Sequence, residues 1–501
     1  MSSDFIAGLL FALLPMAILA NFVGVLLGIV FGALPGLTAT MGLALLIPLT
    51  LGLDPAIAFS ALLGVYVGSI YAGSITAVLI GTPGTAAAAA ALLEGPALTK
   101  KGEAKKSLMM VTVASVIGGL FSCLVLAIVA PQLARVALSF GPPEYFALAL
   151  FGISIVAGVA GKSLMRGLIA GVIGLFIATI GMDPITGISR FTFDNTNLLG
   201  GIDIVPALVG LFAISEVLSR LETQVTTVND KVIDSKVGLK LKEITRNWFN
   251  LLRSSVIGTF IGIIPATGSG IAGYVSYNEA KRASKDKDQW GKGNIDGLAA
   301  TESGNSAVTG GALVPLLTLG IPGDVITAVM LGALMIQGLT PGPMLFVNNG
   351  DIVYGIFIAL IIANIFVLIV GLAGTKVFPK LLRIPETVLM PIIVVLCILG
   401  SYSINNSMFD VIIMFTFGLL GYLLLKVEIP LAPLLLALIL APILEKNFQR
   451  SILISDGALN IFITRPISLV IILVTLTVIG FIIFSEYRKY IQSKKGGQID
   501  A

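Results

Sequence analysis

Long apolar stretches recur along the whole chain and are separated by short polar segments. A helix needs roughly 20 apolar residues to cross a bilayer, and residues 352–374 and 467–484 are clear examples of such stretches. The longest polar segments, residues 220–250 and 281–296, are only loop-sized. The pattern predicts an all-α polytopic membrane protein with about 10–12 membrane-inserted helices, some of them too short to cross.

Composition supports this class and excludes others. Hydrophobic residues make up 56% of the chain and charged residues 12%, whereas soluble proteins carry about 25% charged residues. The chain has no histidine, which removes Ser-His-Asp and Cys-His catalysis and two-histidine zinc motifs. Cys123 and Cys397 lie in apolar runs and predict buried thiols rather than a metal site or disulfide. We therefore expect no enzyme activity, no cofactor and no nucleic-acid partner.

Three short motifs occur twice in the same order. They pair residues 28–36 with 258–266, 81–84 with 320–323, and 143–158 with 385–400. Glycine and proline are common here, so the shared order rather than any single motif predicts a two-fold internal repeat. The expected organisation is a first membrane repeat (residues 1–219, core about 20–200), a basic linker (220–250), a second repeat (251–445), a C-terminal helix region (446–485) and a basic tail (486–501).

The charges of the loops indicate how the two repeats are oriented. Residues 100–106 carry four lysines, whereas the matching residues 338–351 carry no Lys or Arg. Residues 51–56 carry none, whereas the matching residues 281–292 carry five. Because Lys and Arg collect on the cytoplasmic side, these opposite signatures predict repeats of inverted topology. The N-terminus is expected outside, and the linker and C-terminus in the cytoplasm.

Glycine–proline breaks interrupt the apolar stretches at four places, two in each repeat. A broken helix inside a membrane frees backbone groups that need protein or a wet cavity. Its N–H groups suit an anion, and its carbonyls suit a sodium ion. For any single break, a loop or a simple kink is the alternative interpretation. The candidate substrate contacts are Pro35, Gly36, Thr38, Thr40, Gly81, Thr82, Pro83, Gly84 and Thr85 in the first repeat, and Pro265, Thr267, Gly268, Ser269, Gly270, Asn305, Ser306, Pro322 and Gly323 in the second.

Two ionisable residues near the breaks are candidates because burying charge in a membrane is costly. Glu302 lies just before the apolar residues 307–319. Asp324 directly follows a proline–glycine pair, where its carboxylate either caps the next helix or contacts a cation. Asn305 and Asp324 are the candidate contacts of a sodium ion.

Other conspicuous residues have structural interpretations. Gly24, Gly28 and Gly32 recur every four residues, which predicts a smooth helix face for close packing. Glu144 and Glu386 each follow a proline. They are expected in the first turn of a helix, facing an interface.

The breaks resemble those of a known family. The segments are Gly32-Ala33-Leu34-Pro35-Gly36-Leu37-Thr38, Leu79-Ile80-Gly81-Thr82-Pro83-Gly84, and the run from Gly262-Ile263-Ile264-Pro265 to Gly320-Ile321-Pro322-Gly323. They are similar, in order and over about residues 20–440, to the large membrane subunit of the tripartite tricarboxylate transporters.

This resemblance implies a secondary active importer in the bacterial cytoplasmic (inner) membrane. An extracytoplasmic solute-binding protein would deliver a citrate-like di- or tricarboxylate, and a small four-helix membrane subunit would accompany the large one. A sodium or proton gradient would drive uptake through alternating access. One departure concerns residues 297–308, where Thr301, Ser303 and Gly304 replace the proline and alanines common in the family, while Glu302 and Asn305 remain.

Three other functions remain as alternatives. A cation/proton antiporter also uses broken helices, but it requires an acidic pair deep in a span, and no adjacent pair lies at a break. An intramembrane enzyme based on Ser269 requires a lysine partner, and none lies in an apolar run nearby. A purely structural scaffold does not explain the paired breaks.

Overall fold

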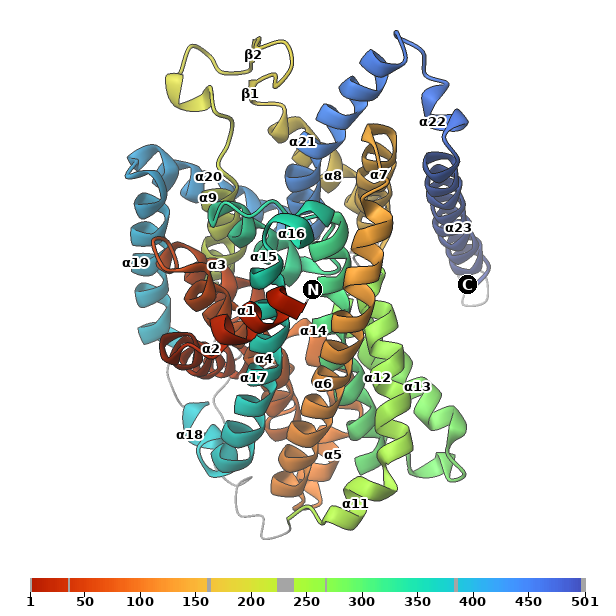
Figure 1. Ribbon diagram of the computed structural model, residues 1–501. Helices are drawn as coiled ribbons and strands as arrows, with labels where there is room; N and C mark the ends of the chain where they lie inside the picture. The colour runs from red at the N-terminus through yellow and green to blue at the C-terminus, as the bar shows by residue number, and fades with distance from the viewer. Residues whose placement is uncertain are drawn as a thin grey trace.

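The computed structural model describes residues 2–34, 37–159, 164–222, 238–265, 268–382 and 386–496. These residues are almost entirely helical (Figure 1). The first half contains α1 (Ser2–Ala12), α2 (Pro15–Ala33), α3 (Ala39–Leu49), α4 (Pro55–Leu79), η1 (Ala86–Leu93), α5 (Gly95–Lys100), α6 (Ala104–Ala137), α7 (Pro142–Val159), α8 (Leu164–Ala178), β1 (Gly181–Met182), β2 (Ser189–Arg190), η2 (Thr196–Leu198), α9 (Ile204–Val209), η3 (Gly210–Ile214) and α10 (Ser215–Arg220). The second half contains α11 (Leu241–Arg246), α12 (Trp248–Ile263), α13 (Gly268–Ala283), η5 (Lys287–Gln289), α14 (Ile295–Leu319), α15 (Val325–Ile336), α16 (Pro343–Asn348), α17 (Gly350–Ala373), η6 (Gly374–Lys376), α18 (Phe378–Leu381), α19 (Glu386–Asn405), α20 (Met408–Lys426), α21 (Leu431–Ile454), α22 (Ile461–Thr464) and α23 (Pro466–Gly496).

Eight helices in the described part of the chain are long and apolar enough to cross a membrane. They are α2, α4, α6, α17, α19, α20, α21 and α23. The apolar helices α3, α8 and α15 have only 10–17 residues, fewer than the roughly 20 that a span requires. The prediction of an all-α polytopic membrane protein with some short inserted helices is confirmed.

The central helix α14 is absent from those eight because it is too polar. Nearly all of its 25 residues are nevertheless buried, since α4, α6, α12 and α13 pack around it. Protein rather than lipid surrounds this helix, so its polar groups avoid the penalty of exposure to hydrocarbon.

The two halves repeat the same order of elements. Helices α2, α3 and α4 correspond to α12, α13 and α14, and a short helix, η1 or α15, follows the second break of each half. Gly24, Gly28 and Gly32 of α2 lie directly against the backbone of α4, where an added Cβ would collide. Gly258 and Gly262 of α12 meet the backbone of α14 in the same way. The predicted close-packing face of α2 is therefore confirmed.

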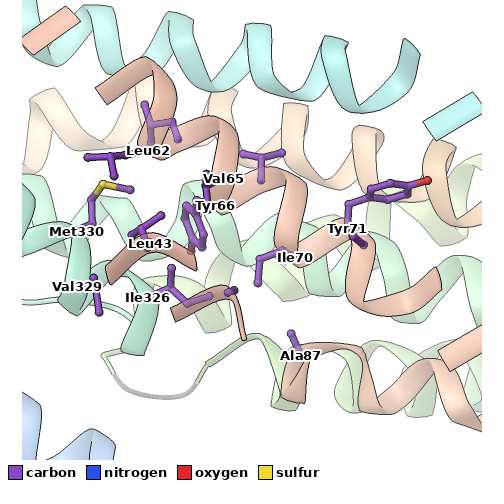
Figure 2. Packing of buried hydrophobic residues seen from close by; sticks show 14 of the residues in the cluster. Leu43, Leu62, Val65, Tyr66, Ile70, Tyr71, Ala87, Ile326, Val329 and Met330 are labelled. Carbon is purple, nitrogen blue, oxygen red and sulfur yellow. The ribbon is translucent and has the colours of Figure 1, made fainter. Parts of the chain in front are cut away.

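Each half packs its later elements against the other half. Helix α6 runs along α14, and α17 runs along α4. The short helix η1 packs on α13, and α15 packs on α3. Figure 2 shows the second of these contacts, with Leu43 of α3 facing Ile326, Val329 and Met330 of α15. The four segments beside the breaks therefore meet in two pairs, each with one member from each half.

The basic segments gather at one end of the molecule. Lys106, at the start of α6, pairs with Glu243 of α11 at 2.8 Å, and Lys101 donates to the carbonyl of Gly293, before α14, at 3.1 Å. Figure 1 shows α5 and α11 together at the lower end. This clustering agrees with the sequence-based assignment of these loops to one side of a membrane.

A two-stranded hairpin lies at the opposite, upper end (Figure 1). Arg190 of β2 holds it to the main helices through a hydrogen bond to Glu445 of α21 at 2.5 Å, and it forms an ion pair within the hairpin with Asp183 at 3.4 Å. The backbone N–H groups of Thr186 and Ile185 also hold the pKa of Asp183 well below its ordinary value. The hairpin is thus a fixed feature of this end.

Candidate functional site

The break between α14 and α15 is closed by hydrogen bonds. Gly320 ends α14 with a left-handed φ of 72°, and Asp324 caps α15. One oxygen of this carboxylate accepts from the backbone N–H of Thr327 at 2.7 Å and from its hydroxyl at 2.8 Å. The other oxygen accepts from the hydroxyl of Tyr66 on α4 at 3.1 Å. Figure 2 shows Tyr66 pointing from α4 toward Leu43 and the start of α15. Both oxygens of Asp324 therefore have partners within the protein.

The break between α4 and η1 has a similar backbone but different side chains. Gly81 is left-handed, with a φ of 71°, and the N–H of Gly84 donates to the carbonyl of Gly73 at 3.0 Å. Thr85 occupies the position before η1, but its hydroxyl makes no capping hydrogen bond. This side chain is only 7% exposed.

A constant numbering offset relates α4 to α14. In each half, three glycines from outside contact equivalent residues of these helices. The contacts on α4 are Gly28 with Val65, Gly32 with Ser69 and Gly84 with Gly73. The contacts on α14 are Gly258 with Gly304, Gly262 with Val308 and Gly323 with Ala312. Each contacted residue of α14 has a number 239 higher than its counterpart on α4, as for Val308 and Ser69. The two breaks, Gly84 and Gly323, differ by the same number.

This offset pairs Asn305 with Tyr66, and Thr85 with Asp324. In one location, Tyr66 donates to Asp324 and closes the contact between the halves. In the equivalent location, an amide and a threonine hydroxyl stand in their places. We call the group formed by Thr85, Asn305 and the adjacent Ser306 the open site.

The polar atoms of the open site have no partners. Within the described residues, neither the Asn305 side-chain amide nor the hydroxyls of Thr85 and Ser306 make a hydrogen bond. Asn305 is 1% exposed and Ser306 is 5% exposed. Leaving a buried polar group unpaired costs about 1–3 kcal/mol, so such groups are normally satisfied. A ligand bound at this meeting of the halves would give these four unpaired atoms the partners that they lack.

Helix α13 also reaches the open site. The helix η1, which begins after Thr85, packs on both α13 and α14. Near the start of α13, Gly270 lies against the carbonyl of Ala86, 3.2 Å from the position of a Cβ added to the glycine. Ser269 beside it is buried. The N-terminal turn of α13 offers free N–H groups and a partial positive charge.

The three elements that meet here, η1, α13 and α14, thus carry or adjoin five of the sequence-predicted contacts: Thr85, Ser269, Gly270, Asn305 and Ser306. The others lie elsewhere or serve the backbone. Thr38 caps α3, Thr40 and Gly84 are buried, Gly268 is left-handed, Gly81 and Thr82 are exposed, Pro83 and Pro265 are partly exposed, and Pro322 and Gly323 are buried in the closed break. Pro35, Gly36 and Thr267 lie outside the described residues.

Glu302 lies one helical turn before the open site on α14 and is 1% exposed. Its carboxylate accepts from the hydroxyl of Ser74 on α4 at 2.5 Å and from that of Ser115 on α6 at 3.4 Å. The sequence marked Glu302 as a candidate by its position but gave it no partner. Tyr66 was missed altogether, because nothing in the apolar sequence around it indicates a distant carboxylate.

A second carboxylate ties the halves together at the basic end. Glu94, which follows η1, is fully buried and accepts from the Tyr277 hydroxyl at 2.8 Å. It also accepts from the backbone N–H groups of Gly291, Gly293 and Asn294 at 2.6, 2.8 and 2.7 Å. These bonds fix the end of η1 to the segment that begins α14. A single glutamate after an alanine-rich run was the only sequence signal.

The remaining ionisable residues of the sequence analysis each lie at the start of a helix. Glu144 lies in the first turn of α7 and accepts from Arg465 at 2.8 Å. Glu386 begins α19, but its side chain lies outside the described part. Among the buried described residues there are carboxylates but no Lys or Arg. An anion in the open site would therefore be held by amide, hydroxyl and backbone N–H groups.

Comparison with known proteins gives a family match. The model of the tripartite tricarboxylate transporter TctA family matches residues 18–436. An uncharacterized 52.8 kDa protein in the TAR-I ttuC′ 3′ region of Agrobacterium vitis is 36% identical over 481 residues, which cover 95% of each chain. An uncharacterized protein in the TAR-II ttuC′ 3′ region of the same organism is 39% identical over 211 residues, 42% of this chain and 87% of the relative. No solved structure matches the chain.

Proposed function

Because the chain belongs to the tripartite tricarboxylate transporter TctA family, we propose that it is the large permease subunit of a binding-protein-dependent importer of citrate-like di- and tricarboxylates. The family is one of transporters rather than enzymes. Its tripartite organisation implies partner subunits, for which we propose a small four-helix membrane protein and an extracytoplasmic solute-binding protein. The complex would lie in the bacterial inner membrane, with the basic end of this chain in the cytoplasm.

The observation that carries the proposal is the open site. Its unpaired amide and hydroxyls lie where η1, α13 and α14 meet, and a carboxylate would accept hydrogen bonds from them. The helix N-terminus of α13 adds free N–H groups suited to an anion. Ser269 and Gly270 would line the same space.

The buried charges support coupling to a cation gradient. A di- or tricarboxylate would enter an interior whose described buried residues include Glu302 and Asp324 but no Lys or Arg. Burying uncompensated like charges is costly, so a sodium ion or proton would accompany the substrate. Of the two sequence-predicted sodium contacts, Asn305 would offer an unpaired amide oxygen, whereas both oxygens of Asp324 already accept hydrogen bonds. Movement of one half against the other would provide alternating access.

The direct test is uptake of labelled carboxylates into vesicles that contain this subunit and its two partners, with and without a sodium or proton gradient. We expect gradient-driven accumulation of at least one di- or tricarboxylate, and none without the binding protein. Failure to accumulate any carboxylate, with the assembled complex verified, would contradict the proposal.

A further inference from the structure

Glu302 is a buried carboxylate without a cation beside it. None of the ion pairs among the described residues includes this carboxylate. Its partners are two serine hydroxyls, Ser74 at 2.5 Å and Ser115 at 3.4 Å. These hydroxyls come from α4 and α6, so elements of the first half enclose a carboxylate of the second half. Two neutral hydroxyls compensate a full negative charge only in part, which leaves this site short of one positive charge.

The other ionisable groups on the surrounding helices do not supply this charge. Tyr71 on α4 lies close enough to interact with Glu302 electrostatically, but it is a neutral phenol bonded to Thr112 at 3.0 Å. Other ionisable side chains of these helices pair with groups other than Glu302: Tyr66 with Asp324, Lys106 with Glu103 and Glu243, Tyr277 with Glu94, Arg282 with Glu279, Asp296 with Arg246 and Asn247, and Arg253 with Asn250. Cys123 on α6 is eight residues beyond Ser115.

Glu302 is also a direct neighbour of the open site. Asn305 and Ser306 follow it by three and four residues on α14, a spacing that brings Cβ atoms within about 5–6 Å on one face of a helix. At roughly 6 Å and an effective dielectric constant of about 20, two unit charges repel enough to weaken binding about a hundredfold. A carboxylate substrate held by Asn305 would therefore bind far better when Glu302 is neutral.

We propose that Glu302 is the proton-binding residue that couples carboxylate uptake to a proton gradient. Protonation of one carboxylate oxygen supplies the missing positive charge and removes the repulsion, so that substrate and proton enter together. Release toward the cytoplasm, where protons are scarcer, leaves Glu302 ionised and expels the substrate. This inference rests on the proposed function and assigns its coupling ion and the residue that carries it.

The test compares Glu302→Gln with the wild type in vesicles that contain all three subunits. Glutamine keeps the shape, with an oxygen that accepts from one serine and an NH2 group that donates to the hydroxyl oxygen of the other, but it carries no titratable proton. With labelled citrate and no sodium, we expect the wild type to accumulate citrate under a proton gradient. The variant should exchange citrate across the membrane without a gradient but should not accumulate it.

The pH dependence of the apparent KM for exchange adds a second readout. The wild-type KM should rise by up to about a hundredfold from acidic to alkaline buffer, whereas the KM of Glu302→Gln should follow only the titration of citrate itself. Asp296→Asn, a change at the start of the same helix, is the matched control and should behave as the wild type does.

Two results would overturn the proposal. One is proton-driven accumulation by Glu302→Gln at the wild-type level, and the other is wild-type accumulation that follows sodium and ignores pH. Absence of citrate exchange in every protein would instead contradict the proposed substrate class. Infrared difference spectra between acidic and alkaline buffer then test Glu302 alone. They should contain a protonated-carboxyl band in the wild type that is missing in Glu302→Gln, and its absence from the wild type would also overturn the proposal.

Discussion

The two equivalent meeting places of the halves differ in how their polar groups are used. In one, Tyr66 of α4 donates to Asp324, and the carboxylate also caps α15. In the other, Asn305 of α14 and Thr85 before η1 hold the same positions by the 239-residue offset, and their side chains have no partners. The two equivalent places therefore hold one closed contact and one open site. Backbone symmetry places the two sites, whereas the side chains decide whether the polar groups there bond to each other or remain unpaired.

The asymmetry extends to the ends of the short helices. Glu94 follows η1 and accepts three hydrogen bonds from the segment that begins α14 and one from Tyr277 of α13, whereas the equivalent position after the same offset is Ala333. The short helix beside the open site, η1, is thus held at its C-terminal end by the carboxylate of Glu94. The short helix of the closed break, α15, is held instead at its N-terminal end, by the hydrogen bond from Tyr66 to Asp324.

The largest expected effect is on transport, from Asn305→Leu. Leucine has a similar size but offers no hydrogen bonds, and losing two bonds of about 1.5–3 kcal/mol each to a charged substrate predicts roughly a thousandfold loss of uptake. Because the change also removes two unpaired buried atoms, thermal stability should stay equal or rise. Uptake of labelled citrate and thermal unfolding of the purified protein measure the two effects. Normal uptake would remove Asn305 from the site.

Glu94→Ala should give the largest loss of stability. It leaves the Tyr277 hydroxyl and three backbone N–H groups without their acceptor, which predicts about 3–5 kcal/mol of destabilisation. The measurement is thermal unfolding in detergent, with Glu94→Gln as a control that retains one acceptor oxygen and should lose less. Stability equal to the wild type would mean that this anchor does not hold the halves together.

Tyr66→Phe should separate the closed contact from the open site. It removes one hydrogen bond to a buried carboxylate, worth about 1.5–3 kcal/mol, while the KM for uptake stays unchanged. Parallel unfolding and uptake measurements check this pair of outcomes. A large change in KM with intact stability would place Tyr66 in substrate binding and reverse the assignment of the two sites.

Thr85→Ala should have the smallest effect, about a tenfold rise in KM for the loss of one hydroxyl donor. Thr85→Ser retains the hydroxyl and should remain close to the wild type. Thr82→Ala is the matched control, since Thr82 is exposed three residues earlier and its replacement should leave KM unchanged. If Thr82→Ala and Thr85→Ala changed KM equally, burial at this break would not determine which threonine contacts the substrate.

The sequence was informative wherever the determinant is local. Proline and glycine end a helix whatever surrounds them, so the breaks could be predicted from residues such as Pro83 and Pro322. The regular glycines of α2 predicted close packing because only a missing side chain permits it. The basic loops could be grouped because charge avoids lipid.

The sequence was uninformative wherever the partner is distant. Tyr66 and Asp324 are 258 residues apart, and Glu94 and Gly291 are 197 apart, so neither contact leaves a local pattern. The two threonines of the first break show the same limit. Local composition made Thr82 and Thr85 equal candidates, but the left-handed turn at Gly81 leaves one exposed and the other buried.

The most direct test of the open site is protection of an engineered cysteine by substrate. In a background with Cys123→Ala and Cys397→Ala, Ser306→Cys places a thiol in the open site, and Val67→Cys places one at the equivalent position beside Tyr66. The measurement is the rate of alkylation of each thiol in the assembled transporter, with and without citrate. The account predicts that citrate slows modification at position 306 and leaves position 67 unchanged. Equal protection at both positions, or at neither while citrate is transported, would contradict it.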